Sequence, residues 1–204
     1  MVSGDPAAPR ASVRAVLLAA GEGSRYRSSG GEGHKLLADF RGRPMLDWAM
    51  ESALRAEIGP VTVVFGAATA PVPEGVEVVD NPDWAAGIAT SLEAALRVAR
   101  AAGETAVVVG LADQPLIEPD AWRRVARAVT DAADRRQGCI AVATYDGIRG
   151  HPVGLGQDVW PLLPRTGDRA ARTLIRAHPE LVLEVPCPGC SVDVDTVEDL
   201  SRWS

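Results

Sequence analysis

Lysine is almost absent from this sequence: Lys35 stands alone among 21 basic residues, and the rest are arginines. Cysteine is scarce too, and three cysteines cannot build a disulfide framework. No apolar run approaches the ~18 residues that a membrane span needs, and residues 1–12 contain no apolar signal-peptide core. These absences argue against a disulfide-stabilised secreted scaffold and a membrane protein, so we expect a cytoplasmic protein.

An excess of positive charge is also missing. The 21 basic and 27 acidic residues give a net charge of −6, whereas surfaces that coat nucleic acid are basic, so we expect no nucleic-acid partner. A chain of 204 residues that is 47% hydrophobic can form one packed core. We predict a disordered tail over residues 1–12 and one domain over 13–204. Nothing in the sequence indicates an oligomeric state.

Short apolar runs alternate with helical patterns along the chain. The runs predict strands at 13–20, 61–65, 76–79, 105–110, 139–145 and 181–185. Apolar spacing and terminating residues predict helices at 44–59, 88–103, 119–136, 157–163, 168–177 and 196–203. Strands that are apolar on both faces indicate a mainly parallel sheet of the α/β class, covered by helices on both sides. Ligands bind such sheets beyond the carboxyl ends of the strands.

A glycine-rich loop follows the first strand. Residues 21–34 hold five glycines and three serines, and backbone N–H groups of such loops can turn toward an anion. Arg25 and Lys35 add positive charge, which favours a small polyanion. The dinucleotide-binding pattern needs glycine where Tyr26 stands, and the P-loop pattern fails at Lys35-Leu36. A solvated surface loop is the alternative interpretation.

Five motifs in this order resemble the MobA-like nucleotidyltransferases, and most closely the molybdenum cofactor (molybdopterin) cytidylyltransferases. The first is the signature loop, Leu18-Ala-Ala-Gly-Glu-Gly-Ser-Arg25 followed by Lys35-Leu-Leu37. The loop between Tyr26 and His34 is longer than usual for the family. The other four motifs are Asn81-Pro82 with Gly87 and Ser91-Leu92, then Leu111-Ala-Asp-Gln-Pro115, Gly150-His-Pro152 and Asp193-Val-Asp-Thr196.

The resemblance implies a Rossmann-like three-layer α/β/α sandwich of the nucleotidyltransferase (GT-A-like) type. It also implies transfer of a nucleoside monophosphate, CMP from CTP, to a phosphorylated small-molecule acceptor such as molybdopterin cofactor, with release of pyrophosphate. Arg25, Lys35 and Asp113 would be catalytic, and Asp113 and Asp195 would hold Mg²⁺. The nucleotide would contact Leu18, Ala19, Ala20, Gly21, Gly23, Arg25, Lys35, Asn81, Gly87 and Ser91, and His151 would contact the acceptor.

The chemistry fits these residue types. A phosphate monoester is largely a dianion at pH 7, so the nucleophile needs no general base. Mg²⁺ neutralises phosphate charge and is usually held by one or two carboxylates. A lysine supplies a mobile point charge beside the reacting phosphate, and an arginine grips phosphate oxygens with two donors.

Each candidate has a structural alternative. Asn81, Gly87 and Ser91 would serve equally as helix caps, and His151 as a packing residue. Asp113 could instead cap the turn into the next helix, although we favour the metal role. Asp193 and Asp195 alternate at strand spacing; we favour Asp195 as the ligand, although it also resembles a cap of the last helix.

Other functions remain open at this point. Cys187 and Cys190 are compatible with a turn between strands, a reversible disulfide or a metal site. Transfer to a sugar- or alditol-phosphate, an inactive nucleotide-binding homologue and an NAD(P) oxidoreductase are the competing functions.

Overall fold

The computed structural model describes residues 11–135 and 137–204. Its centre is a seven-stranded sheet in the order β5-β4-β1-β6-β8-β7-β9. The strands are β1 (Val13–Ala19), β4 (Val61–Phe65), β5 (Val76–Asp80), β6 (Ala106–Leu111), β7 (Ile140–Tyr145), β8 (Ile148–Gly156) and β9 (Val182–Pro186). All neighbouring pairs are parallel except those of β8, which runs antiparallel to β6 and β7. The expected mainly parallel sheet is therefore confirmed.

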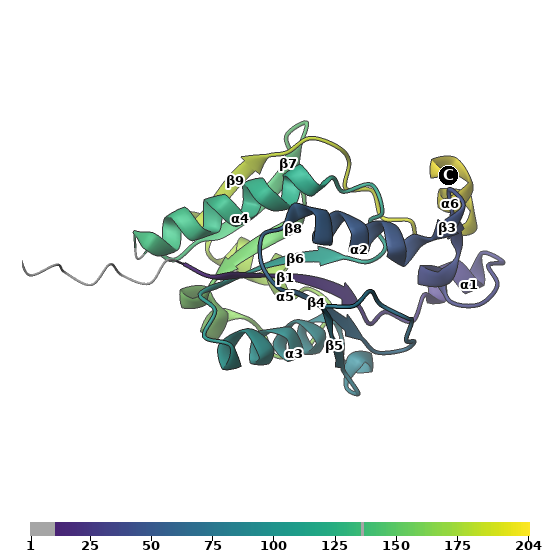
Figure 1. Ribbon diagram of the computed structural model, residues 1–204, viewed down its shortest axis with the longest axis horizontal. Helices are drawn as coiled ribbons and strands as arrows, with labels where there is room; N and C mark the ends of the chain where they lie inside the picture. Colours follow the sequence, from purple (N-terminus) through teal and green to yellow (C-terminus); the bar gives the residue numbers. More distant parts are fainter. Residues whose placement is uncertain (1–10, 136) are drawn as a thin grey trace, which may run out of the picture.

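Helices cover both faces of this sheet, which gives three layers (Figure 1). On one face lie α2 (Met45–Ala56) and α4 (Pro119–Asp134), and on the other lie α3 (Ile88–Ala101) and α5 (Ala170–Ala177). Alternate residues of β1 supply both cores, because successive side chains of a strand point to opposite faces. Leu17 packs in the α2 and α4 core, and Val16 packs in the α3 and α5 core. The three-layer α/β/α sandwich predicted from the sequence is confirmed.

Most predicted elements are present with shifted ends, and several features differ. The helix predicted at 157–163 is a 3-10 helix, Gln157–Leu162. Strand β8 was not predicted, because glycine and proline at 150, 152, 154 and 156 are typical of a loop. Gly154 is needed inside it: a Cβ there would lie 3.0 Å from Val125 and 3.1 Å from Val129 of α4. The loop after β1, predicted to be irregular, contains the five-residue helix α1 (Ser24–Ser28).

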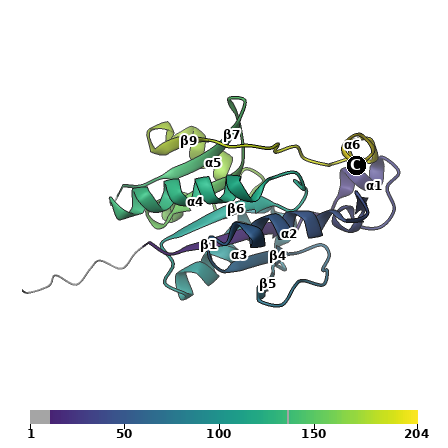
Figure 2. The ribbon, with the colours of Figure 1, turned by 45° about the horizontal axis from the view of Figure 1, so that its top comes forward.

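The chain ends at the edge of the sheet where the carboxyl ends of β1 and β6 lie. Helix α6 (Val197–Trp203) lies beside α1 at this edge in both views (Figures 1 and 2). The Val197 N–H donates to Ser29 Oγ at 3.0 Å. A small ribbon of β2 (Asp39–Phe40) and β3 (Arg43–Pro44) leads into α2. The hydrogen bond from Val197 to Ser29 brings the segment before α6 to the loop after β1.

Ten residues of the predicted tail, 1–10, lie outside the described residues, and the single-domain organisation over 13–204 stays a prediction. Across the described parts of the chain, no helix combines the length and apolar character that crossing a membrane requires.

Candidate active site

The carboxyl ends of β1 and β6 carry the two segments from which the site is built. The glycine-rich loop leaves β1 at Ala20, and Asp113 follows β6 by two residues. The two ends are held together by a backbone hydrogen bond from the Ala112 N–H to the Leu18 carbonyl at 3.0 Å. Any ligand of the loop therefore lies next to Asp113.

Lys35 lies at the centre of the site. It begins a short 3-10 helix, Lys35–Leu37, and is only 7% exposed. Its Nζ donates to Asp113 Oδ2 at 2.7 Å and to Asp195 Oδ1 at 2.8 Å. Burial opposes the charged form, but the two carboxylates outweigh burial and raise the pKa of Lys35 above its usual value. The ammonium is therefore charged and bridges segments 78 and 160 residues away in sequence.

Arg25, from α1, completes the charged cluster. Its guanidinium lies 2.5 Å from Asp195 Oδ2, so both oxygens of Asp195 are paired with cations. The Arg25 side chain is 76% exposed, which leaves most of its donors free for a ligand. We call Arg25, Lys35, Asp113 and Asp195 the charged cluster. All four were predicted from the sequence, and the structure brings them together.

Asp113 has a coordination position left over. Its Oδ1 atom is buried and has no hydrogen-bond partner, and such atoms usually have one in native proteins. A divalent cation would use this lone pair, and Mg²⁺ is commonly held by one or two carboxylates with other oxygens from phosphates. No group of three or more candidate metal ligands occurs among the residues described. Asp113 and Asp195 therefore fit a metal ion that shares its ligands with a bound triphosphate.

His34 ties the lysine turn to the glycine-rich loop. Its Nε2 lies 2.9 Å from the Gly21 carbonyl, and its Nδ1 accepts from the Leu36 N–H at 3.4 Å. These partners require a neutral ring with the proton on Nε2, and burial lowers the pKa of His34 in agreement. The sequence analysis assigned His34 no role. The structure makes it the link that positions Lys35.

The segment Ser191 to Thr196 approaches Asp113 from the other side. The Val194 N–H donates to the Asp113 carbonyl at 3.0 Å, and Gln114 Nε2 donates to Asp193 Oδ1 at 2.6 Å. The segment forms no regular strand, but Asp193 and Asp195 both line one cavity while Val194 between them is buried. The two carboxylates nevertheless have different partners. Burial, followed by the charge of Asp113, raises the pKa of Asp193. The cap of α6 is Thr196, which forms a capping box with Asp199, so Asp195 is free for the charged cluster.

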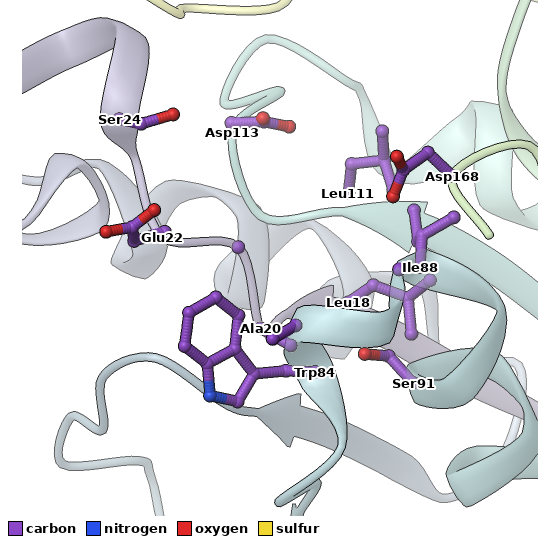
Figure 3. A pocket seen from close by; sticks show the side chains of 13 residues that line it. Leu18, Ala20, Glu22, Ser24, Trp84, Ile88, Ser91, Leu111, Asp113 and Asp168 are labelled. Carbon is purple, nitrogen blue, oxygen red and sulfur yellow. The ribbon is translucent and has the colours of Figure 1, made fainter. Parts of the chain in front are cut away.

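A first cavity of about 480 Å³ runs from the glycine-rich loop to the start of α3 (Figure 3). Leu18, Ala20, Gly21, Gly87 and Ser91 line it as predicted for a nucleotide site. Unpredicted lining residues include Glu22, Ser24, Ile88 and Trp84, whose ring lies beside Ala20 in Figure 3. We call this space the loop cavity.

Five predicted nucleotide residues do not line the loop cavity: Arg25 and Lys35 belong to the charged cluster, and Ala19, Gly23 and Asn81 lie behind the lining. Ala19 is buried in the core beneath α2, and Gly23 packs against Lys35, whose Cβ would lie 3.1 Å from a Cβ at that glycine. Asn81 is 3% exposed, and its amide donates to Ser91 Oγ and Thr90 Oγ1, both at 2.9 Å. Asn81 therefore positions Ser91 and does not itself line the cavity.

A second cavity of about 320 Å³ adjoins the first. The two share Leu18, Ile88, Leu111, Asp113 and Asp168. His151 lines this second cavity, and burial lowers its pKa to about 4, so the ring is neutral at pH 7. We call this space the His151 cavity; Arg25 and Asp195 line it, and Asp113 lines both cavities.

Cys187 and Cys190 are both free thiols in the turn after β9. Cys187 Sγ contacts the Val185 carbonyl at 3.2 Å, and burial raises the pKa of this thiol. Neither cysteine lines either cavity.

Comparison with known proteins agrees with this geometry. The MobA-like NTP transferase domain matches residues 15–182. A curated relative, nicotine blue oxidoreductase of Paenarthrobacter nicotinovorans, is 33% identical over 206 residues, covering 93% of this chain and 95% of its own.

Two similar solved structures are of Rv0371c from Mycobacterium tuberculosis and of a nucleotidyl transferase from Methanothermobacter. The first has a TM-score of 0.74 and 27% identity, covering 95% of this chain and 97% of its own. The second has a TM-score of 0.75 and 25% identity, covering 94% and 95%. Rv0371c has also been solved as a manganese complex, which is 28% identical to this chain with a TM-score of 0.72 and covers 94% of this chain and 97% of its own.

Proposed function

Because this chain belongs to the MobA-like NTP transferase domain family, and is thus a nucleotidyltransferase, we propose that it transfers CMP from CTP to a phosphorylated small molecule, with molybdopterin cofactor as the first acceptor to test. The observation that carries this proposal is the charged cluster beside two adjoining cavities, with Asp113 lining both and Arg25 and Asp195 lining the second. One cavity is bordered by the glycine-rich loop and the other by His151. A transferase needs two substrates to meet at one point of concentrated charge.

The reaction balances without an acid or base from the protein. An oxygen of the acceptor phosphate attacks the α-phosphorus of CTP and forms the new O–P bond. The bond between the α-phosphorus and the bridging oxygen breaks, and pyrophosphate leaves with the electron pair. The acceptor phosphate is largely a dianion at pH 7, so no proton must first be removed.

The difficulty of this reaction is electrostatic, because two anions must approach each other. The Lys35 ammonium and the Arg25 guanidinium supply positive charge beside the triphosphate, in a site that is partly shielded from water. A Mg²⁺ ion held by Asp113 and Asp195 would neutralise further charge on the phosphate oxygens. The manganese complex of Rv0371c supports a divalent metal for this fold.

The choice of cytidine and of molybdopterin is supported by the Leu18-Ala-Ala-Gly21 loop and the Asp113-Gln-Pro115 motif, which resemble those cytidylyltransferases. A sugar- or alditol-phosphate would fill the same acceptor role. An inactive nucleotide-binding homologue is disfavoured, because the lysine and both carboxylates lie within hydrogen-bond distance of one another.

Oxidoreduction is a second candidate, favoured by the name of the curated relative. The structure supports it less well. Dinucleotide sites place the pyrophosphate at the start of a long helix after the first strand, but α1 has only five residues. Tyr26 is buried, and a Cβ at Gly31 would lie 2.3 Å from its ring, so the ring occupies the interior of this loop.

The experiment is a pyrophosphate-release assay with each of the four NTPs, Mg²⁺ or Mn²⁺, and a panel of acceptors that includes molybdopterin cofactor and common sugar phosphates. We expect release with CTP and an acceptor, and a drop of about 10²–10³ in turnover for Asp113→Ala. Asp131→Ala, which removes an exposed carboxylate from α4, is the control and should leave turnover unchanged. NADH or NADPH oxidation without pyrophosphate release would instead select the oxidoreductase.

A further inference from the structure

The His151 cavity contains two arginines that no motif identified. Arg169 and Arg172 both line it, at the N-cap and in the first turn of α5. Building on the proposed function, we propose that this cavity is the acceptor site and that Arg169 and Arg172 recognise the acceptor by its phosphate group.

An acceptor site must lie beside the bound triphosphate, and the position of the His151 cavity satisfies this requirement. It is lined by Arg25, Asp113 and Asp195 of the charged cluster, and it shares Asp113 and Asp168 with the loop cavity. In Figure 3, Asp113 and Asp168 lie on either side of Leu111 at this junction. A molecule in the His151 cavity therefore lies directly beside a triphosphate held by the glycine-rich loop.

A site for a phosphorylated acceptor must also offer free positive charge, and the His151 cavity does so. About half of the other exposed arginines in the described chain are paired with a carboxylate, as Arg100 is with Glu93 and Arg124 with Asp120. Within the described chain, Arg169 and Arg172 form no ion pair with a carboxylate. The cavity's own carboxylates are largely engaged: Asp195 by Lys35 and Arg25, Asp113 by Lys35, and Asp193 by Gln114. Asp168 faces both cavities, and the two guanidinium groups stay free to bind an anion.

The remaining lining indicates what the rest of the acceptor is like. Leu92, Val109 and Val153 line the cavity with apolar side chains, and His151 adds a neutral hydrogen-bonding ring. A volume of about 320 Å³ lies at the small end of the usual range for ligand sites. This combination fits a small molecule with an apolar or flat body and a terminal phosphate. Guanidinium groups bind phosphate with two parallel hydrogen bonds, which gives both charge and orientation.

In the transfer step, the arginines act on the acceptor alone. They hold the acceptor phosphate by one pair of oxygens, so that another oxygen faces the α-phosphorus. The bond changes are those given above, with pyrophosphate as the leaving group. The arginines should therefore determine the KM for the acceptor and leave the KM for CTP unchanged.

The α5 region offers a matched control. Arg165 and Arg176 are exposed arginines of the same segment that line neither cavity. The variants R169Q/R172Q and R165Q/R176Q each remove two positive charges from the same part of the surface. A general change in surface potential would affect both variants equally, whereas loss of specific recognition would affect only the first.

With the best acceptor from the pyrophosphate assay, we expect R169Q/R172Q to raise the acceptor KM about 100-fold, as for the loss of two charge-assisted contacts. The KM for CTP should stay within about twofold of wild type, and R165Q/R176Q should match wild type in both constants. Equal acceptor KM values for the two double variants would overturn the proposal. Circular dichroism confirms that each variant is folded.

A binding experiment separates this proposal from the proposed function. Inorganic phosphate is titrated into the wild type and both double variants by calorimetry, with acetate as a parallel arm. Phosphate binding that is lost only in R169Q/R172Q supports the anion site, even if no NTP supports turnover and the transferase proposal fails. Phosphate affinity that is the same in both double variants overturns the anion site, and acetate binding as tight as phosphate overturns the phosphate assignment.

Discussion

Lys35 occupies the space between two carboxylates that a metal ion would also use, and this geometry predicts competition between the two cations. A cation held by the free Oδ1 of Asp113 and by Asp195 would bind the same two carboxylates that Nζ now contacts at 2.7 and 2.8 Å, so the two positive charges would compete for them. Lys35 is 7% exposed, so an ammonium displaced from both partners would be buried and unpaired. We therefore expect the protein without nucleotide to bind Mn²⁺ weakly, and Lys35→Met to bind it much more tightly.

The size of the effect follows from the cost of breaking such a pair. Removing the partner of a buried charge costs about 3–5 kcal/mol, and each 1.4 kcal/mol is tenfold in an equilibrium constant. Taking the lower end for a site that opens on a cavity, Lys35→Met should gain about 100-fold in Mn²⁺ affinity. Methionine keeps a similar length and volume without the charge. Lys35→Arg keeps the charge and should gain far less than Lys35→Met.

The assay is titration of Mn²⁺ followed by electron paramagnetic resonance without nucleotide, because bound Mn²⁺ loses the sharp signal of the hydrated ion. Arg27→Met is the control, since Arg27 is a cation of the same loop that pairs with Glu22 and not with the charged cluster. Equal Mn²⁺ affinities for wild type and Lys35→Met would refute the reasoning. An equal gain in Mn²⁺ affinity in Arg27→Met would show that the effect comes from surface charge in general and not from Lys35.

Three further predictions concern pH, the loop cavity and the cysteines. The His151 ring binds a proton below about pH 6.5 in the unfolded chain, but only near pH 4 in the folded protein, where it is buried. As the pH falls from 6.5 to 4, wild type should therefore lose up to about 3 kcal/mol of unfolding free energy, measured by urea titration in EDTA. His151→Gln should lack this loss. Gly87→Ala should weaken CTP binding in calorimetry, because Gly87 has a φ of +106° and a Cβ there would lie 2.5 Å from the Gly167 carbonyl carbon. Gly75→Ala is the control, since Gly75 also has a positive φ, +85°, but no neighbour within 4 Å, and it should bind CTP normally. Cys187→Ser should keep turnover within a few-fold of wild type, since the thiol lies outside both cavities; an unfolded product would overturn that expectation.

The fold was largely predictable because burial on both faces leaves a direct mark on the sequence. Val61–Phe65 is apolar except for Thr62, and all five of its residues are buried in β4. Strand β8 escaped detection because its glycines serve packing, and close approach to α4 requires small residues where a strand pattern expects large ones. Such a requirement depends on a partner about 25 residues earlier in the chain, which local periodicity cannot reveal.

The site was predictable where topology alone sets position. Lys35 follows the loop after β1 and Asp113 follows β6, and adjacent parallel strands end at the same edge of the sheet. The roles of His34 and Asn81 were not predictable, because each acts through a hydrogen bond to another site residue. Arg169 and Arg172 carried no signal, since two arginines in an arginine-rich helix are typical of a solvated face.

The same geometry accounts for the single lysine in a chain that otherwise uses arginine. A phosphate can be bound by either residue, so phosphate binding does not by itself require lysine. The space between Asp113 and Asp195 restricts the choice of side chain more, because the single nitrogen of Lys35 contacts both carboxylates and the whole residue is buried. A compact ammonium on a flexible stem fits such a space, and it can turn toward a triphosphate when one arrives, whereas a planar guanidinium spreads its donors over a wider fork. Lys35 then serves as the counter-ion of the empty site and as the phosphate ligand of the filled one, and the two carboxylates become free for a metal only when it changes partners.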